Sequence, residues 1–276
     1  MTLRLFVEQP LAAAGVVELP AAAVRHLQVR RLQPGDALVV FDGRGGEWRA
    51  EVAGIGRRSA QVRLIAFEAL QREPALAVTL AVGMPANERM DWLVEKAAEL
   101  GAARIVPLLC ERSVLRLSGE RAQRRREHWQ AVAVAAAEQS GATRLTEVEP
   151  VTVIGDWLDA GLQRESPHAR RCLLSAPRAG PVARPAPHGG SSKVAEPHLL
   201  DSLTGDAATE PATAGGEALV VLSGPEGGLS DAEEAAARAA GFMPLTLGPR
   251  TLRAETAPLV ALARWQAWAR QGNSAG

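Results

Sequence analysis

The chain has 276 residues, a formal net charge of zero and a hydrophobic content of 47%. This length allows one large domain or two modest ones, each with a buried core. Because the net charge is zero, overall charge alone cannot hold the chain on nucleic acid. Two cysteines are too few for a disulfide framework or a cysteine metal cluster.

The first ten residues, MTLRLFVEQP, lack an apolar core long enough for a signal peptide. No later segment reaches the roughly 18 consecutive apolar residues that a membrane span requires. We therefore expect a cytoplasmic protein without a membrane-spanning segment. Cys110 and Cys172 lie in apolar runs, so we expect them to be buried and not to bind a metal.

Residues 1–72 have the pattern of a small β-barrel. Short runs rich in Val and Leu alternate with turn-forming sequences such as PGD and DGRGG. The expected strands are Leu3–Val7, Ala37–Phe41, Glu47–Ala53 and Ala60–Phe67, and one helix is expected at Ala21–Arg31, after Pro20.

The same segment contains more arginines than acidic residues. Several basic residues cluster at Arg25, His26, Arg30 and Arg31. Two interpretations are open. The cluster is either a solvated face or a surface that contacts RNA phosphates, for which the arginine side chain is well suited.

From Ala75 the chain alternates between strand and helix patterns, which is typical of an α/β domain. We expect a strand at Leu76–Met84, a helix at Asn87–Leu100 and a strand at Ala103–Cys110. Lys96 lies on this helix, and its ammonium group either stays in water or contacts RNA.

A long Ala-rich helix is expected between Ser118, as its N-cap, and Gly141. Its first turns are rich in arginine and include Arg124 and Arg125. This cluster is either a solvated, salt-bridged face or the border of an RNA site. Trp129 follows it and offers an aromatic plane on which a base can stack.

A break in the α/β pattern follows the strand that we expect at Arg171–Ala176. Residues from about 177 to 216 are rich in Pro, Gly and Ala and contain few large apolar side chains. We expect this segment to be a flexible surface insertion in the α/β domain.

The last part of the chain contains the same arrangement twice: a short apolar strand is followed by a Gly-Pro loop and then by a helix. The strands are expected at Leu219–Leu222 and Pro244–Leu247. In open α/β sheets ligands bind at the carboxyl ends of strands, where loop amides and helix N-termini converge. Gly224, Gly227 and Gly228 allow a ligand to approach the backbone closely. No dinucleotide or P-loop fingerprint accompanies these loops.

Each of these loops precedes a helix. Ser230 and Glu233 have the spacing of a capping box, which predicts a helix at Asp231–Gly241. Thr256 is the expected N-cap of the last helix.

The motifs GPEGGLS (Gly224–Ser230) and LGPRTLRAETAP (Leu247–Pro258) resemble the paired C-terminal motifs of SPOUT-class RNA methyltransferases and are most similar to those of the RsmE family. RHLQVRRLQPGDALVVFDGRGGEW (Arg25–Trp48) resembles the N-terminal PUA-like domain of that family. The resemblance implies an α/β protein that forms a homodimer. It has a small PUA-like β-barrel at 1–72 and a trefoil-knotted SPOUT methyltransferase domain at 73–272.

The resemblance also implies an activity. The family transfers a methyl group from S-adenosylmethionine to N3 of a uridine, in a reaction of the uracil(1498)-N3 type, in the 16S ribosomal RNA of the small subunit. It implies no metal. The residues expected to bind the cofactor are Leu222, Gly224, Pro225, Gly227, Gly228, Leu247, Gly248, Leu252 and Thr256, and those expected to bind RNA are Arg25, His26, Arg30, Arg31, Arg124 and Arg125.

Methylation at uracil N3 requires stabilisation of negative charge on the base and an acceptor for the N3 proton. Arg253 is the first candidate for the charge-stabilising role and Arg250 the second. Glu226 is the candidate proton acceptor, and its alternative role is that of a turn acid bound to loop amides. Glu138 and Gln139, in a run that matches the family, are candidates for the substrate side of the pocket.

Other functions stay open at this point. One is a SPOUT methyltransferase that acts on tRNA or on large-subunit RNA, and another is a non-catalytic RNA-binding module that keeps the fold. A nicotinamide-dependent dehydrogenase is the least favoured, because the phosphate-binding fingerprint is absent.

Overall fold

The computed structural model describes residues 2–57, 59–74, 76–86, 88–175 and 218–272. The insertion predicted at about 177–216 lies outside these ranges, as does Ala176, the last residue of a predicted strand. The chain divides into two compact units. The first contains residues 1–74, 94–103 and 127–147, and the second contains 75–93, 104–126 and 148–276.

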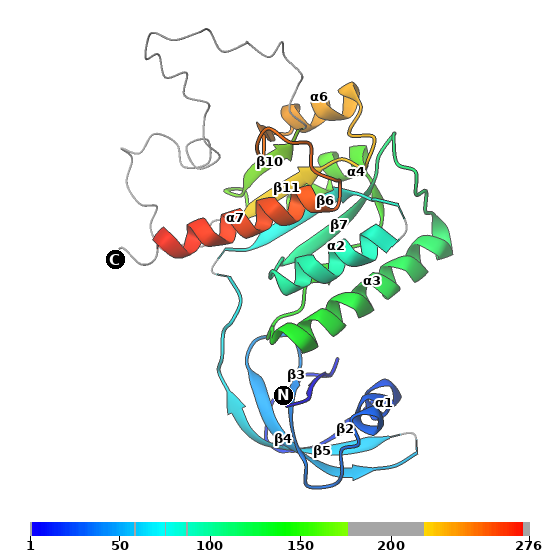
Figure 1. Ribbon diagram of the computed structural model, residues 1–276, viewed down its shortest axis with the longest axis vertical. Coiled ribbons are helices and arrows are strands. Elements are labelled where there is room, and N and C mark those ends of the chain that lie inside the picture. Colours follow the sequence, from blue (N-terminus) through cyan, green and yellow to red (C-terminus); the bar gives the residue numbers. More distant parts are fainter. Residues whose placement is uncertain (1, 58, 75, 87, 176–217, 273–276) are drawn as a thin grey trace. The chain divides into compact units, whose positions relative to one another are not determined.

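The first unit is built on a five-stranded sheet with the order β1-β3-β4-β5-β2 (Figure 1). Strands β1 and β3 are parallel, and the other neighbours are antiparallel. Strand β2 was not predicted, because it exposes most of its side chains and lacks a clear alternation. The elements are β1 (Arg4–Phe6), β2 (Gly15–Leu19), α1 (Ala21–Val29), β3 (Ala37–Phe41), β4 (Glu47–Ile55) and β5 (Ala60–Glu68).

The core of the first unit lies between this sheet and α1. Leu27 of α1, Val40 of β3 and Val62 of β5 are fully buried in one hydrophobic cluster. The rings of Trp48 and Phe67 lie 5.4 Å apart, and the Trp48 indole N–H donates to the Leu11 carbonyl oxygen at 3.3 Å. These bounds confirm the helix predicted after Pro20 and the four predicted strands, because the predicted and observed ends differ by no more than two residues.

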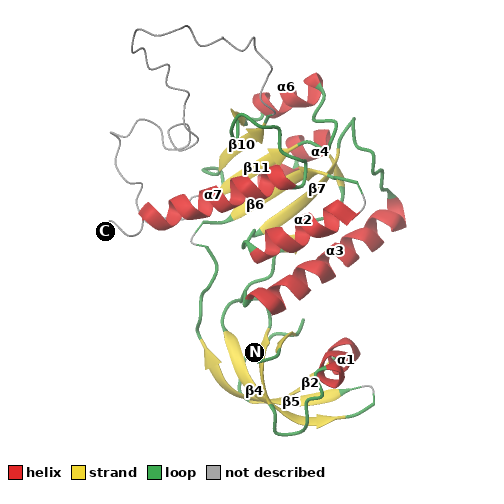
Figure 2. Ribbon diagram, viewed as in Figure 1, coloured by secondary structure: helices red, strands yellow, loops and turns green. Residues whose placement is uncertain are grey.

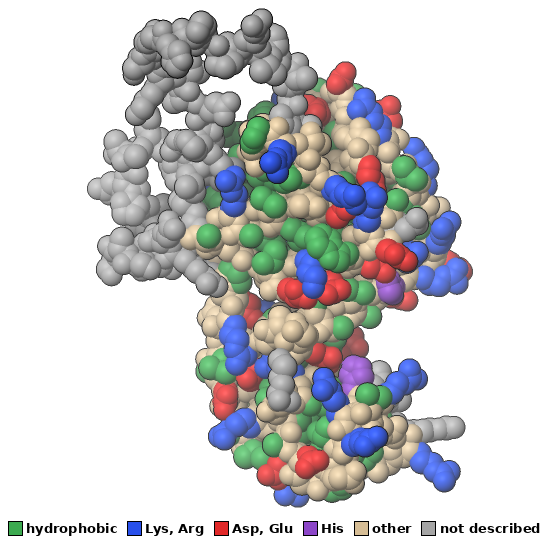
Figure 3. Space-filling model, in the orientation of Figure 1, with side chains coloured by type: hydrophobic (Ala, Val, Ile, Leu, Met, Phe, Trp, Pro, Cys, Tyr) green, Lys and Arg blue, Asp and Glu red, His purple; other side chains and the backbone are tan. Residues whose placement is uncertain are grey.

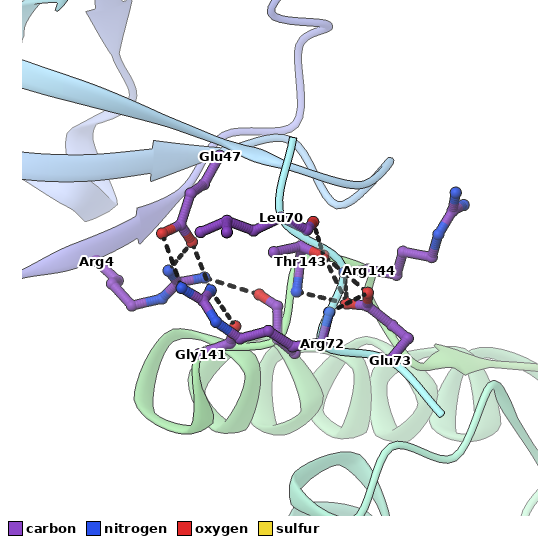
Figure 4. A network of polar contacts seen from close by, with 9 residues as sticks. Arg4, Glu47, Leu70, Arg72, Glu73, Gly141, Thr143 and Arg144 are labelled. Atoms are coloured by element: carbon purple, nitrogen blue, oxygen red, sulfur yellow. Dashed lines mark hydrogen bonds and ion pairs between the residues drawn. The ribbon is translucent and has the colours of Figure 1, made fainter. Parts of the chain in front are cut away.

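A buried polar network ties together distant segments of the first unit (Figure 4). The Glu47 carboxylate accepts hydrogen bonds from both Arg4 and Arg72, and it is only 5% exposed. The two guanidinium groups also donate to the carbonyl oxygens of Ala142 and Gly141, at 2.8 and 2.9 Å. Through these two arginines, the Glu47 carboxylate connects segments that lie up to 138 positions apart in the chain.

A second acid in Figure 4 continues this network. The Glu73 carboxylate accepts from the backbone N–H groups of Thr143 and Arg144, at 2.6 and 2.7 Å, and from the Thr143 hydroxyl. Thr143 is fully buried. These bonds hold the segment that follows the long helix.

The second unit is built on a mostly parallel sheet with the order β12-β10-β11-β6-β7-β8 (Figure 2). Strands β12, β10, β11, β6 and β7 run parallel, and β9 pairs with β7. Most residues of these strands are buried, as expected for a sheet covered on both faces. The strands are β6 (Val78–Gly83), β7 (Arg104–Leu109), β8 (Glu147–Val148), β9 (Thr152–Val153), β10 (Arg170–Leu174), β11 (Leu219–Ser223) and β12 (Met243–Leu245).

Helices cover this sheet on both faces. Side chains of α4, η1 and α6 join Ala81, Val220 and Leu222 of the sheet in one core cluster. On the other side α7 contacts β11 and β6. The helices that lie wholly in this unit are α4 (Ile154–Asp159), the 3₁₀ helix η1 (Gly161–Arg164), α6 (Asp231–Ala239) and α7 (Thr256–Gly272), whereas α2 (Glu88–Glu99) and α3 (Gly119–Ser140) each contribute residues to both units.

The two predicted helix starts near the C-terminus have different outcomes. The capping box is present, because the Ser230 hydroxyl accepts from the Glu233 N–H and the Glu233 carboxylate accepts from the Ser230 N–H. The prediction that Thr256 is an N-cap is wrong. Its N–H already bonds to the Arg253 carbonyl oxygen at 2.9 Å, and Thr256 is the first residue of α7, so Glu255 occupies the position before the helix.

The α/β expectation is confirmed, whereas the trefoil knot stays a prediction. Within the described ranges, no helix combines the length and apolar character of a membrane span.

Candidate active site

A cavity of about 590 Å³ opens at the carboxyl edge of the parallel sheet in the second unit. Its walls come from the segments that follow β6, β7, β10, β11 and β12, so the sheet brings together residues that are far apart in the chain. Its volume is typical of a site for a small organic molecule. The lining residues are Arg89, Arg112, Leu174, Ser175, Ser223, Gly224, Pro225, Glu226, Gly227, Gly228, Leu229, Glu234, Leu247, Arg250, Thr251, Leu252, Arg253, Ala254 and Ala257.

The GPEGGLS loop and the end of β6 require glycine because their backbones approach each other closely. A Cβ atom on Gly83, at the end of β6, would lie 2.6 Å from the Pro225 nitrogen. A Cβ on Gly224 would lie 2.7 Å from the Leu229 nitrogen, and Gly228 has φ = +70°. The GPEGGLS loop therefore folds back on itself against β6, as only glycine permits.

Arg112, from the loop after β7, holds this glycine-rich loop from outside. Its guanidinium donates to the carbonyl oxygens of Gly227 and Leu229, at 3.2 and 3.0 Å. The turn that carries Arg112 is itself closed, because the Cys110 N–H donates to the Ser113 hydroxyl at 3.0 Å. Arg112 thus fixes the two carbonyl groups on either side of Gly228.

Glu226 is anchored rather than free in the cavity. Its Oε1 accepts a hydrogen bond from the Ala86 backbone N–H at 2.9 Å and one from Arg89 at 3.3 Å. The alternative role of Glu226, a turn acid bound to a loop amide, is therefore present in the structure. Its role as a proton acceptor stays a proposal.

Two arginines stand on another part of the cavity rim. Arg250 and Arg253 line the cavity from the loop before α7, and the Arg253 side chain is 72% exposed. The buried carboxylate of Glu255 lies 3.9 Å from Arg253 and 3.9 Å from Arg89. This rim suits a ligand that carries or develops negative charge.

Two hydroxyl groups in the cavity wall lack hydrogen-bond partners within the described structure. They are the Oγ atoms of Ser175, after β10, and of Ser223, at the end of β11, and both are buried from solvent. Buried hydroxyl groups are normally hydrogen-bonded. The cavity therefore offers polar contacts that the chain itself leaves unused.

The part of the chain that the structure describes contains no cluster of His, Cys, Asp and Glu able to hold a metal ion. Burial raises the pKa of Cys110 to about 12 and that of Cys172 to about 11. Both thiols are therefore protonated at neutral pH, and the prediction that they are buried is confirmed.

The structure gathers most of the predicted catalytic and cofactor-binding residues around the cavity and leaves three of them outside its lining. Leu222 is fully buried in the hydrophobic core, Gly248 lies in an open turn with φ = +120°, and Thr256 begins α7. The predicted residues that line the cavity are Gly224, Pro225, Glu226, Gly227, Gly228, Leu247, Arg250, Leu252 and Arg253.

The predicted RNA-binding residues lie on both units. Arg25 and His26 are exposed on α1, and Arg30 and Arg31 follow that helix. Figure 3 shows basic side chains interspersed with acidic ones over the visible face. Their assignment to RNA therefore stays a prediction.

The predicted RNA-binding residues of α3 are Arg124, which is exposed and lies 3.6 Å from Glu120, and Arg125, which is half-buried. The prediction for Trp129, in contrast, is wrong. Its side chain is 1% exposed, because Trp129 lies on the buried face of α3, and it therefore cannot stack on a base.

Two further candidates outside the cavity lining have partners of their own. The Glu138 carboxylate accepts from the Phe6 backbone N–H at 3.0 Å, and Lys96 donates to Glu95 and Glu99 at 2.7 Å each. For Lys96 this geometry favours the solvated interpretation.

Sequence reasoning missed three polar residues of the site: Arg89, Arg112 and Ser223. It did predict that the end of the strand at Arg171–Ala176 forms a wall of the pocket, and Ser175 lies there. The rule that ligands bind at carboxyl ends of parallel strands, applied also to β6 and β7, indicates the segments that carry Arg89 and Arg112.

The chain matches two family models. One describes an RNA methyltransferase domain and matches residues 71–183 and 193–266, and the other describes an RNA methyltransferase PUA domain and matches 19–65. Together with the parallel sheet and its cavity, these matches define an RNA methyltransferase with a PUA-like N-terminal domain.

Similar proteins assign the chain to one family within this class. The chain is 34% identical to a ribosomal RNA small subunit methyltransferase E of Synechocystis, with 96% of this chain and 77% of that protein covered. It is 28% identical to the enzyme of the same name from Bacillus subtilis, with 94% of each covered. The chain belongs to the ribosomal RNA small subunit methyltransferase E family.

A solved structure agrees. The methyltransferase E of Neisseria gonorrhoeae, whose crystal structure contains S-adenosylmethionine, superposes with a TM-score of 0.78 at 29% identity and covers 97% of this chain and 98% of that one.

Proposed function

We propose that this chain methylates N3 of a uridine in the 16S RNA of the small ribosomal subunit, with S-adenosylmethionine as the methyl donor. The observation that carries the proposal is the cavity, which the glycines of one loop line together with Arg250 and Arg253 of another. Family membership and the cofactor in the Neisseria structure support the donor.

The residues present fit this cofactor. A nucleoside with an amino acid tail needs close backbone approach and polar partners. Gly224, Gly227 and Gly228 supply the first, and the unpartnered hydroxyl groups of Ser175 and Ser223 supply the second. Leu247 and Leu252 add apolar walls for a flat ring.

When bound, the cofactor supplies a methyl group on a positively charged sulfur. The N3–C bond forms as the C–S bond breaks, and the N3 proton must leave the base. Arg253 stabilises the negative charge that develops on the uracil oxygens, and Arg250 takes the second place at the same rim. Glu226, oriented by Ala86 and Arg89, is the proposed acceptor of the proton.

The same proposal includes the wider assembly. The exposed basic residues of α1 and α3 contact RNA phosphates, whose negative charge they match. The protein acts in the cytoplasm as a homodimer and needs no metal.

The test is transfer of labelled methyl groups from S-adenosylmethionine to small ribosomal subunits, free ribosomal RNA and tRNA, followed by nucleoside analysis. We expect 3-methyluridine in small-subunit RNA. Label in tRNA or in another nucleoside would keep the enzyme class and replace the substrate. Absence of both transfer and cofactor binding in calorimetry would favour a non-catalytic RNA-binding protein.

One variant tests the role of Arg253 directly. Arg253→Ala removes a charge that is needed only when uracil becomes negative, so kcat should fall by about 10²–10³-fold. The Kd for S-adenosylmethionine in calorimetry should change little. A variant that loses cofactor binding to the same extent as activity would place Arg253 in cofactor binding instead.

A further inference from the structure

Glu255 is a buried acid directly behind the cavity wall. It is 6% exposed and occupies the position before α7. Its Oε1 lies 3.9 Å from Arg89 Nε and 3.9 Å from Arg253 Nη1. Its Oε2 is buried from solvent and has no hydrogen-bond partner among the described residues.

Glu255 belongs to a row of alternating charges in the second unit. Glu226 contacts Arg89 at 3.3 Å, Arg89 reaches Glu255, and Glu255 reaches Arg253. The first, second and last members line the cavity, whereas Glu255 does not. It therefore acts on a ligand only through the two arginines.

A buried carboxylate with an unused oxygen is unfavourable unless a cation satisfies it. The Arg253 side chain is 72% exposed, so burial does not hold it in place, and its Nη1 already lies 3.9 Å from the other oxygen of this carboxylate. A guanidinium held in one orientation stabilises developing charge better than a mobile one, because no reorganisation is needed during the reaction.

We propose that Glu255 is a positioning residue for methyl transfer, whose buried carboxylate orients the Arg253 guanidinium toward the cavity with Arg89 on its other side. This inference rests on the proposed function. It assigns no contact between Glu255 and substrate or cofactor.

A structural role is the competing explanation. A negative charge at the N-terminus of a helix stabilises that helix, and Glu255 precedes α7. The test must therefore distinguish an effect on folding from an effect that passes through Arg253.

The experiment is a double-mutant cycle of Glu255→Gln and Arg253→Ala, with kcat for small ribosomal subunits and the Kd for S-adenosylmethionine measured for each protein. We expect Glu255→Gln alone to lower kcat by about 10–100-fold and to leave the Kd within about twofold. In the Arg253→Ala background it should lower kcat by no more than about twofold, because only Arg89 remains of the two groups through which it acts.

Glu165→Gln is the matched control. Glu165 is also a buried acid paired with an arginine, Arg104, but Arg104 and Thr79, its partners, lie at the amino ends of β7 and β6. This variant should lower the melting temperature and leave kcat unchanged. Equal losses of kcat from Glu255→Gln with and without Arg253 would overturn the proposal.

A second readout does not depend on activity. In nitrogen-15 NMR of the cofactor-bound protein, the Arg253 Nε–H should exchange with solvent faster in Glu255→Gln than in the wild type, whereas the Arg250 Nε–H should not change. Unchanged Arg253 exchange would overturn the inference even if methyl transfer is confirmed. A faster exchange together with no methyl transfer to any RNA would contradict the proposed function alone.

Discussion

Gly83 is the residue at which β6 meets the GPEGGLS loop. Its backbone is in an ordinary conformation, so the requirement for glycine comes from space and not from φ. A Cβ there would lie 2.5 Å from Pro225 Cδ and 2.6 Å from Pro225 N. Because one of these atoms is backbone, the clash can be relieved only by moving the loop.

We therefore predict that Gly83→Ala displaces the Gly224–Pro225 turn, at a cost of about 1–3 kcal/mol. The affinity for S-adenosylmethionine in calorimetry should fall by about tenfold or more. Gly155→Ala in α4 is the control, since a Cβ at Gly155 meets nothing within 4 Å and Ala favours a helix. Unchanged affinity in Gly83→Ala would show that the loop tolerates the shift.

At the scale of elements, the N-terminus of α6 is fixed from two directions. The Ser230–Glu233 capping box closes the first turn, and the other oxygen of Glu233 accepts from the Glu111 N–H at 2.7 Å. Glu111 follows β7, so one carboxylate both caps the helix and attaches it to the neighbouring strand.

Removal of the Ser230 N-cap should lower the stability of the protein by a small but measurable amount. Ser230→Ala leaves the Glu233 N–H without its acceptor, and the free energy of unfolding in urea should fall by about 1 kcal/mol. Ser230→Asp keeps an acceptor at the same place and should retain most of the stability. Equal losses in both variants would mean that the Ser230 side chain acts through packing rather than capping.

At the scale of the whole molecule, the Glu47 network links stability to pH. Burial, the largest single influence, raises the pKa of Glu47, but the hydrogen bonds and charges of Arg72 and Arg4 together outweigh it and hold the pKa below its usual value. A lowered pKa in the folded state means that the stabilisation is complete above the unfolded-state pKa and is lost as the pH falls through the folded-state pKa.

We expect the unfolding free energy to decrease on acidification below about pH 4. Glu47→Gln should flatten this decrease and destabilise the protein by about 3 kcal/mol at pH 7, because it leaves two arginines without their carboxylate. Glu68→Gln is the control. Its pair with Arg49, at 2.9 Å, is largely exposed and should contribute less than about 1 kcal/mol. Parallel pH profiles for wild type and Glu47→Gln would contradict this account.

The molecular mass of the protein in solution tests the proposed homodimer. Light scattering during size-exclusion chromatography should give twice the 29.1 kDa of one chain. A mass of one chain at micromolar concentration would contradict the proposal and leave the cavity, which one chain builds alone, unaffected.

Much of the site was predictable because its signals are local. The GPEGGLS and LGPRTLRAETAP loops follow apolar strands at short spacing, and the three glycines of the first loop and Arg253 of the second line one cavity. The Ser230–Glu233 cap is likewise a contact between residues three apart. Turn chemistry, capping and strand patterning act within a few residues, so the sequence by itself determined the α/β class and the two loops that line the cavity.

Only the tertiary structure decided which distant residues complete the site. Arg89 and Arg112 reach the cavity because parallel strands end at one edge, and they contact residues more than 100 positions away. Long-range packing also buries Trp129, whereas its position beside the arginine cluster had predicted an exposed ring. Glu255 acquires its importance in the same way, from burial between two arginines, and spacing along the chain carries no information about burial.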